Sequence, residues 1–155
     1  MKEIKAKHYV DTTIHLYDLI IKTLKSYLKQ KIDKLNIGIT SEQLVVLDTI
    51  TCYDNMYQQK LSEILMKDKS NTTRIIKVLS DKKLITKEIG TVNKRLAYIL
   101  KVTDKGQKIL DENMPKIKKY IEDMFSNISD EEVEMLHNLS KKVNKDLKKE
   151  EKAEA

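Results

Sequence analysis

The chain has 155 residues, of which 40% are hydrophobic and 35% are charged, a composition that suits a single domain with a very polar surface. Three glycines and one proline leave few turn positions, so we expect long helices to dominate. The sequence lacks a signal-peptide pattern and an apolar run long enough to span a membrane, and its single cysteine, Cys52, excludes an intrachain disulfide. We therefore expect a cytoplasmic protein.

The positive charge is concentrated in one part of the chain. The formal net charge is +6, yet residues 56–105 alone contain twelve Lys or Arg against five Asp or Glu, a net of +7. The remaining residues therefore carry a net charge of −1, since +6 − 7 = −1. Scattered lysines usually indicate only a hydrated surface, whereas concentration in one segment favours a site that neutralises phosphates.

Residues 8–35 are predicted to form the first helix. Its apolar residues recur at three- and four-residue steps, namely Leu16, Leu19, Ile20, Leu24, Tyr27, Leu28 and Ile32. Residues 36–39 end this helix, with Gly38 as the turn residue. Thr40 and Gln43 then fit a capping box that opens a second helix. The expected buried positions of this second helix are Leu44, Leu47, Ile50 and Thr51.

A helix-turn-helix is predicted to follow. A short helix over 58–66 turns Leu61, Ile64 and Leu65 inward, and Lys67-Asp68 makes the turn. The next helix, over about 69–82, has two unlike faces. Thr72 (by its methyl group), Ile75, Ile76 and Leu79 share the apolar face, whereas Ser70, Asn71, Thr73, Arg74 and Lys77 project from the other.

Two β-rich runs come next and predict a hairpin. Residues 84–89 and 96–102 are rich in β-branched or aromatic residues, and the loop over 90–95 contains Gly and Asn. Thr103 is expected to cap a helix over 104–125, which Pro115 should kink because proline removes one helical hydrogen bond. A second capping box over 129–132 starts the last helix. Its predicted apolar stripe is Val133, Leu136, either Leu139 or its near neighbour Val143, and Leu147.

The order of elements predicts a mainly α fold with a small β-hairpin wing. A winged helix-turn-helix lobe over 40–103 would lie between dimerisation helices over 8–35 and 104–148, all within one domain of residues 1–155. Because the terminal helices are amphipathic and the winged helix does not need them all for its core, a homodimer is their most economical use. The alternative is that they only thicken the core of a monomer.

Four local patterns, in this order and spacing, resemble the MarR family of bacterial and archaeal transcription regulators. They are Gly38-Ile39-Thr40-Ser41-Glu42-Gln43, Ser70-Asn71-Thr72-Thr73-Arg74, Leu79 through Leu84-Ile85, and Thr103-Asp104-Lys105-Gly106. The chain departs from the family in two places. Lys83 stands where the family often has glycine, which carries a steric cost if that backbone is left-handed. The wing has Asn93-Lys94-Arg95, one residue farther from Thr103 than the family's Asp-x-Arg.

The resemblance implies a homodimer on a pseudo-palindromic operator in double-stranded DNA, with a small-molecule effector that alters the spacing of the two recognition helices. In a helix-turn-helix the second helix lies in the major groove, where Asn suits adenine and Arg suits guanine. The wing over about 90–95 would meet the flanking backbone or the minor groove. The candidate DNA-binding residues are Ser70, Asn71, Thr72, Thr73, Arg74, Lys77, Lys94 and Arg95. We favour Thr73, Arg74 and Lys77. The alternative for Arg74 is a salt bridge within the domain to Asp48 or Asp54.

Other functions have less support in the sequence. A winged helix used as a protein-interaction module, without sequence-specific DNA contact, is the main alternative. No catalytic set, phosphate loop or cofactor motif is present, so we do not expect an enzyme. No metal site is expected, because His8, His15 and His137 do not form a ligand cluster. Cys52 could sense oxidants, but a buried small hydrophobe is the commoner role. Tyr9, Tyr17, Tyr53 and Tyr120 could line an effector cleft, although core packing is the commoner fate of tyrosines.

Overall fold

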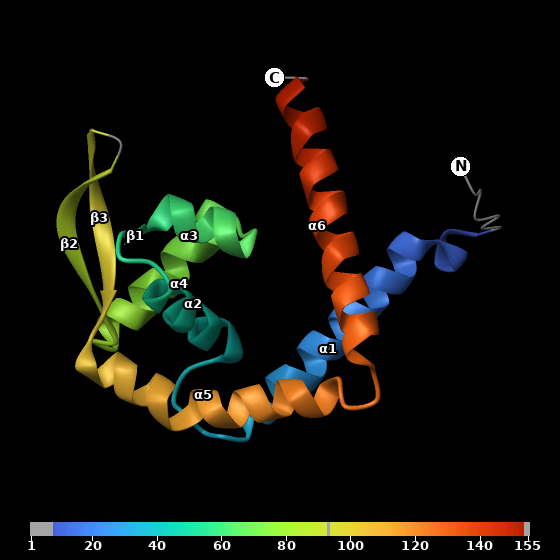
Figure 1. Cartoon of the computed structure of the whole chain (residues 1–155). Coiled ribbons are helices and arrows are strands. Elements are labelled where there is room, and N and C mark those ends of the chain that lie inside the picture. Colours follow the sequence, from blue (N-terminus) through green and yellow to red (C-terminus); the bar gives the residue numbers. More distant parts are fainter. Residues whose placement is uncertain (1–7, 93, 154–155) are drawn as a thin grey trace. The chain divides into compact units, whose positions relative to one another are not determined.

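The computed structural model describes residues 8–92 and 94–153. The chain divides into two compact units at Lys118 and Lys119, and each unit is described by itself (Figure 1). The first unit contains η1 (Tyr9–Asp11), α1 (Thr13–Asp33), α2 (Ser41–Thr51), β1 (Met56–Tyr57), α3 (Gln58–Leu65), α4 (Lys69–Asp81), β2 (Ile85–Val92) and β3 (Arg95–Val102). Helix α5 (Asp104–Met124) begins in the first unit and ends in the second, which also contains α6 (Asp130–Ala153).

The predicted mainly α fold with a hairpin wing is confirmed. Among the described residues, no helix combines the length and the apolar character that crossing a bilayer requires.

The ends of α1 and α2 are fixed by local capping. Helix α1 starts later than predicted, at Thr13, because Thr12 is its N-cap and accepts a hydrogen bond from the backbone N–H of His15 at 3.3 Å. Gly38 has φ +75°, so its predicted turn role is confirmed. The capping box of Thr40 and Gln43 is also present in full.

Burial along α2 and α3 follows the predicted pattern with three exceptions. Leu44, Leu47, Ile50 and Leu61 are buried as predicted and Leu65 is partly buried. The prediction that Thr51 is buried was wrong, because its hydroxyl is exposed and donates to the carbonyl of Asp48 at 2.7 Å. Ile64 is 40% exposed rather than inward, whereas Val46, which we did not predict, is fully buried.

The sheet has three antiparallel strands in the order β1-β3-β2. Strand β1 was not predicted, since two residues are too few to show a strand pattern. It pairs Met56 with Leu100 of β3. The predicted loop over 90–95 was too long: the strands extend to Val92 and Arg95, which pair with each other. The wing is therefore a long hairpin with a two-residue connection over 93–94, as Figure 1 shows by its extension beyond β1. Residue 93 lies outside the described residues.

One hydrophobic core joins the helices of the first unit to the sheet. Its buried members are Ile32, Leu44, Val46, Leu47, Ile50, Met56, Leu61, Ile75, Ile76, Leu79, Leu84, Ile85, Leu100, Leu110 and Ile117. The set draws on α1, α2, α3, α4, all three strands and α5. Burying one such side chain stabilises the fold by about 1.5–3 kcal/mol. The core therefore fixes α4 and the base of the wing on one scaffold.

Helix α4 ends in a Schellman motif, a turn that normally places glycine in the left-handed position. The N–H of Leu84 donates to the carbonyl of Leu79, and the N–H of Lys83 donates to the carbonyl of Ser80, both at 2.9 Å. Leu79 and Leu84, the hydrophobic pair of the motif, are both buried. Lys83 holds the left-handed position with φ +58°, which meets the condition under which a steric cost is expected for this departure from the family.

We predict that Lys83→Gly raises the free energy of unfolding by about 1 kcal/mol, since it removes the left-handed strain of a side-chain-bearing residue. Denaturant unfolding followed by circular dichroism measures the change. Lys87→Gly is the matched control, because Lys87 is an exposed residue of β2 and glycine weakens a strand interior. A loss of stability in both variants would show that Lys83 is not strained.

The second unit comprises the end of α5 and the whole of α6. Helix α5 is one helix with Pro115 inside it, and the kink expected at Pro115 stays a prediction. The capping box at the start of α6 is confirmed: Ser129 N–H donates to Glu132, and Glu132 N–H donates to the Ser129 hydroxyl. The predicted apolar stripe of α6 is 40–49% exposed at Val133, Leu136, Leu139 and Val143. The side chain of Leu147 lies outside those described.

Candidate nucleic-acid interface

Helix α4 is anchored by its buried face and by its N-cap. Thr72, Ile75, Ile76 and Leu79 are buried, as predicted. The carboxylate of Asp68 accepts a hydrogen bond from the backbone N–H of Asn71 at 2.7 Å and so closes the first turn. The opposite face of the same helix is thereby held outward.

Ser70, Thr73, Arg74 and Lys77 form the exposed face of α4. The hydroxyl of Thr73 donates to the carbonyl of Lys69 at 2.7 Å and accepts from Nε2 of Gln58 at 2.6 Å, so α3 helps to orient it. Thr72 requires a correction as a candidate contact. Its side chain is fully buried and its hydroxyl donates to the carbonyl of Asp68 at 3.0 Å, so it cannot reach an external ligand.

Arg74 is held by a hydrogen-bond network that the sequence did not reveal. Its Nη2 donates to Oδ1 of Asn71 at 3.1 Å, and Nδ2 of Asn71 donates to Oε1 of Glu42 at 3.4 Å. Glu42, in the first turn of α2, also forms an ion pair with Lys67. The alternative for Arg74 is not observed, because among the ion pairs of the described residues none joins it to an aspartate.

The pKa of Glu42 lies below its ordinary value, mainly because Lys67 donates a hydrogen bond to the carboxylate. The charge of Lys67, the hydrogen bond from Asn71 and the charge of Arg74 lower the pKa further, whereas partial burial raises it. Since the folded pKa is lowered, the ion pair stabilises the fold above the ordinary glutamate pKa. That stabilisation disappears as the pH falls through the lowered value.

We predict that Glu42→Gln lowers the free energy of unfolding at pH 7 by no more than about 1 kcal/mol, because more than a third of the Glu42 side chain is exposed. The difference from the wild type should vanish at a pH below the folded pKa of Glu42. Urea unfolding at neutral and acid pH measures both. Glu112→Gln on α5, whose carboxylate lies 3.8 Å from Lys108, is the control. A pH-independent difference at Glu42 would contradict the ion-pair assignment.

The wing places its two candidate residues at the hairpin end. Lys94, with φ +63°, and Arg95 are both exposed. Ile89 pairs with Tyr98 across the hairpin, and Ile89, Leu96 and Tyr98 are 74%, 80% and 63% exposed. The wing surface is therefore part basic and part apolar.

A groove of about 600 Å³ lies between α3, the start of α4 and strand β3. Lys67 and Lys69 line one part of it, and Leu96 and Tyr98 line another. These groove residues were not among the predicted contacts. The excess of positive charge over residues 56–105 pointed to these lysines. Their spacing along the chain could not show that they line one groove together with the wing residues Leu96 and Tyr98.

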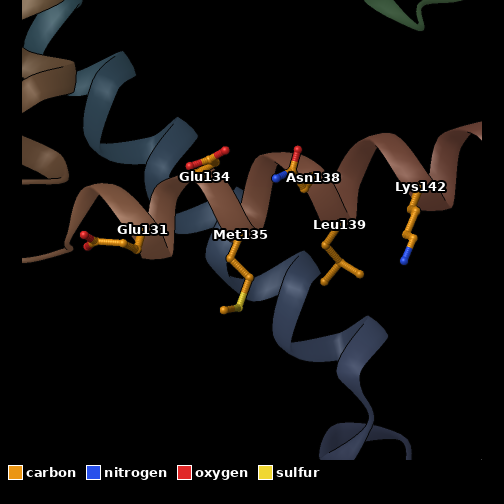
Figure 2. A pocket seen from close by; sticks show the side chains of 6 residues that line it. All are labelled: Glu131, Glu134, Met135, Asn138, Leu139 and Lys142. Atoms are coloured by element: carbon orange, nitrogen blue, oxygen red, sulfur yellow. The ribbon is translucent and has the colours of Figure 1, made fainter.

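In the second unit, a shallow hollow follows one side of α6. It is lined by Glu131, Glu134, Met135, Asn138, Leu139 and Lys142. Figure 2 shows Met135, Leu139 and Lys142 projecting to the same side of the helix. Met135 is 70% exposed and Leu139 is 43% exposed, and every lining residue comes from this one helix. The hollow is therefore part of an exposed helix surface rather than an enclosed site.

Cys52, Tyr9 and Tyr53 lie at the surface, and the effector cleft suggested for the tyrosines stays a prediction. The preferred interpretation of Cys52 as buried was wrong: it is exposed at the end of α2, and its thiol lies 3.6 Å from the carbonyl of Asp48. Tyr9 contacts His15 edge to face at 5.6 Å, and Lys60 lies over the ring of Tyr53 at 4.1 Å. Within the described residues, no three His, Cys, Asp or Glu side chains gather as a metal ion would require.

Comparison with known proteins places the winged-helix segment in a family. The model of the MarR family matches residues 39–96. The HTH-type transcriptional regulator MhqR of Bacillus subtilis is 24% identical over 106 residues, which cover 68% of this chain and 72% of MhqR. The uncharacterized protein MJ1254 of Methanocaldococcus jannaschii is 32% identical over 87 residues. That match covers 56% of this chain but only 18% of MJ1254.

Solved structures share the fold. The MarR/EmrR family regulator of Acinetobacter sp. ADP1 superposes with a TM-score of 0.75 at 21% identity, over 88% of this chain and 94% of that one. The MepR–DNA complex of Staphylococcus aureus gives a TM-score of 0.73 at 23% identity, over 89% and 99%. The family model thus identifies residues 39–96, from the N-cap region of α2 to the start of β3, as a MarR-family segment, and the solved regulators share the fold of most of the chain.

Proposed function

We propose that this chain binds a pseudo-palindromic operator in double-stranded DNA as a homodimer, with α4 in the major groove. The observation that carries the proposal is the two-faced α4: four core residues hold one face, and Ser70, Thr73, Arg74 and Lys77 are exposed on the other. The MepR structure contains DNA, which supports the same use of the fold here. Short polar side chains and a guanidinium at the start of a helix suit base edges and nearby phosphates.

The wing and the groove extend this surface. We assign Lys94 and Arg95 to the flanking backbone or minor groove. If α4 and the wing enter neighbouring grooves, one phosphodiester strand must pass between them. The groove between α3, α4 and β3 lies there, with Lys69 and the Glu42-paired Lys67 as its cations and Glu63 also in its lining. Ile89, Leu96 and Tyr98 would face sugars rather than phosphates, since they are apolar and exposed.

Homodimerisation is supported by apolar side chains that the single chain leaves exposed. On α1, Leu16, Leu19 and Ile20 are 51%, 53% and 48% exposed. On α6, Val133, Leu136, Leu139 and Val143 are 40–49% exposed. Partner subunits that covered these stripes would set two recognition helices about 34–36 Å apart, the spacing of successive major grooves. A small-molecule effector, implied by the family resemblance, stays a prediction.

An electrophoretic mobility shift tests the proposal, with DNA from upstream of the chain's own gene, competitor DNA and two salt concentrations. We expect a specific complex whose affinity falls by roughly 10³–10⁵ between about 50 and 200 mM salt if six to ten phosphates are neutralised. Sedimentation of the free protein should give twice the mass of the chain. Salt-independent binding, or no preference over competitor, would instead favour the protein-interaction module, for which the apolar wing surface would be the docking face.

A further inference from the structure

Glu42 lies outside the exposed face of α4, yet it is connected to that face through Asn71. Glu42 belongs to the first turn of α2, 29 residues before Asn71 in the chain. It forms an ion pair with Lys67, and the same oxygen, Oε1, accepts from Nδ2 of Asn71. Oδ1 of Asn71 then accepts from Nη2 of Arg74 at 3.1 Å.

The chemistry of the two neighbours fixes the orientation of the Asn71 amide. A carboxylate can only accept hydrogen bonds and a guanidinium can only donate them. The amide nitrogen must therefore face Glu42 and the amide oxygen must face Arg74, so the flip of this side chain is not arbitrary. Glu42 acts on Arg74 through a single intervening amide.

The same arrangement changes the role expected for Asn71. Bidentate recognition of adenine uses both the oxygen and the nitrogen of an asparagine side chain. Here the oxygen is engaged by Arg74 and the nitrogen by Glu42. Asn71 thus has one amide proton and one lone pair already engaged within the protein, whereas Arg74 uses one guanidinium nitrogen and is exposed. A guanidinium that is already hydrogen-bonded at one nitrogen loses less rotamer freedom on pairing with guanine than a guanidinium without that bond.

We propose that Glu42 is a positioning residue for base recognition, which it serves by orienting Asn71 so that Asn71 braces the Arg74 guanidinium. The inference rests on the proposed function, because it assumes that Arg74 reads a base. Glu42 itself touches no DNA. Its positioning role should appear as sequence preference at one base pair of each half-site rather than as overall affinity, which the phosphate contacts dominate.

In vitro selection from a pool of random-sequence DNA duplexes tests the inference without knowledge of the operator. The wild type defines the selected site, and Arg74→Ala identifies the base pair whose preference depends on Arg74. We expect Glu42→Ala to weaken preference at that same base pair by about 3- to 10-fold, the size of coupling between residues in one network. Preference at other positions should not change, whereas overall affinity and its salt dependence should rise, because the variant also frees Lys67 in the groove proposed for the phosphodiester strand.

A double-mutant cycle then shows whether Glu42 acts through Asn71. In the Asn71→Ala background, Glu42→Ala should cause no further loss of preference at the Arg74 base pair. Glu42→Gln keeps an oxygen that can accept from Asn71 and should restore most of the preference, which separates orientation from charge. Glu112→Ala on α5 is the control for removal of an exposed glutamate.

The outcomes separate this inference from the proposed function. If the wild type selects no sequence, the proposed function fails. If the wild type selects a site and Glu42→Ala selects it with unchanged preference, the positioning role is wrong. An equal further loss in the Asn71→Ala background, or a loss spread evenly over all positions of the site, would likewise overturn it, since a merely structural role lowers all contacts together.

Discussion

Replacing Gly106 with alanine is expected to lower the free energy of unfolding by about 2–3 kcal/mol, the cost of overpacking a tightly packed site. Gly106 is buried in the first turn of α5, close to Leu84 in the turn between α4 and β2. A Cβ atom there would lie 2.3 Å from the backbone oxygen of Leu84 and 2.8 Å from Cγ1 of Val102. The Leu84 oxygen cannot move freely, because it accepts a hydrogen bond from the N–H of Thr103 at 3.0 Å.

The sign of this effect distinguishes packing from helix propensity. Alanine is the better helix former by about 0.8–1 kcal/mol, so propensity alone predicts that the variant gains stability. Thermal unfolding should instead show a fall in Tm of roughly 4–12 °C. Gly38→Ala is the matched control. A Cβ at Gly38 meets no atom within 4 Å, so only its φ of +75° opposes alanine, at about 1 kcal/mol. A Gly106 variant at least as stable as the wild type would show that this junction is not tightly packed.

The local parts of this fold could be predicted because their causes are local. The capping boxes at Thr40 and Ser129 need only a side chain and a backbone N–H three residues away, and both are present. The buried face of α4 follows from the helical period, and all four of its members were predicted. The left-handed position of Lys83 could be expected because the family resemblance marked it as a glycine site.

The parts that failed depend on distant neighbours. Strand β1 exists because Met56 and Tyr57 meet β3, more than forty residues later. The exposure of Thr51 and Cys52 depends on where α2 ends against the rest of the unit. Hairpin length was underestimated because Gly90 looked like a loop residue. In the structure it is a strand residue whose missing Cβ leaves room for Ile99, 2.6 Å from where a Cβ would lie.

The same distinction applies to the interface. Exposure of Ser70, Thr73, Arg74 and Lys77 on α4 could be predicted from period alone. Thr72 carries both a methyl group, which suits the core, and a hydroxyl, which suits DNA contact. The sequence could not show whether this side chain would be buried or exposed. The core buries the methyl group and the Asp68 carbonyl satisfies the hydroxyl. The contact between Asn71 and Glu42 was hidden, because no periodicity connects residues of different helices.

Arg74→Ala is expected to weaken binding to the selected operator by about 5- to 150-fold, which corresponds to about 1–3 kcal/mol for loss of a bidentate base contact. Arg74 is exposed on α4 and donates a hydrogen bond to Asn71, and it takes part in none of the ion pairs of the described residues, so its removal leaves the core and these ion pairs intact. Titration of labelled operator DNA, and of scrambled DNA of the same length, measures affinity and specificity separately. Binding to scrambled DNA should weaken much less than binding to the operator.

Two further variants decide between base recognition and simple charge. Arg74→Lys keeps the positive charge but loses the planar fork, so it should retain binding to scrambled DNA and lose preference for the operator. Arg95→Ala on the wing should weaken both DNAs to a similar extent, because a phosphate contact carries no sequence information. If Arg74→Ala lowered operator and scrambled binding equally, or Arg74→Lys matched the wild type, Arg74 would be a phosphate contact. Sequence reading would then have to come from Ser70, Thr73 or Lys77, the other exposed candidate residues on α4.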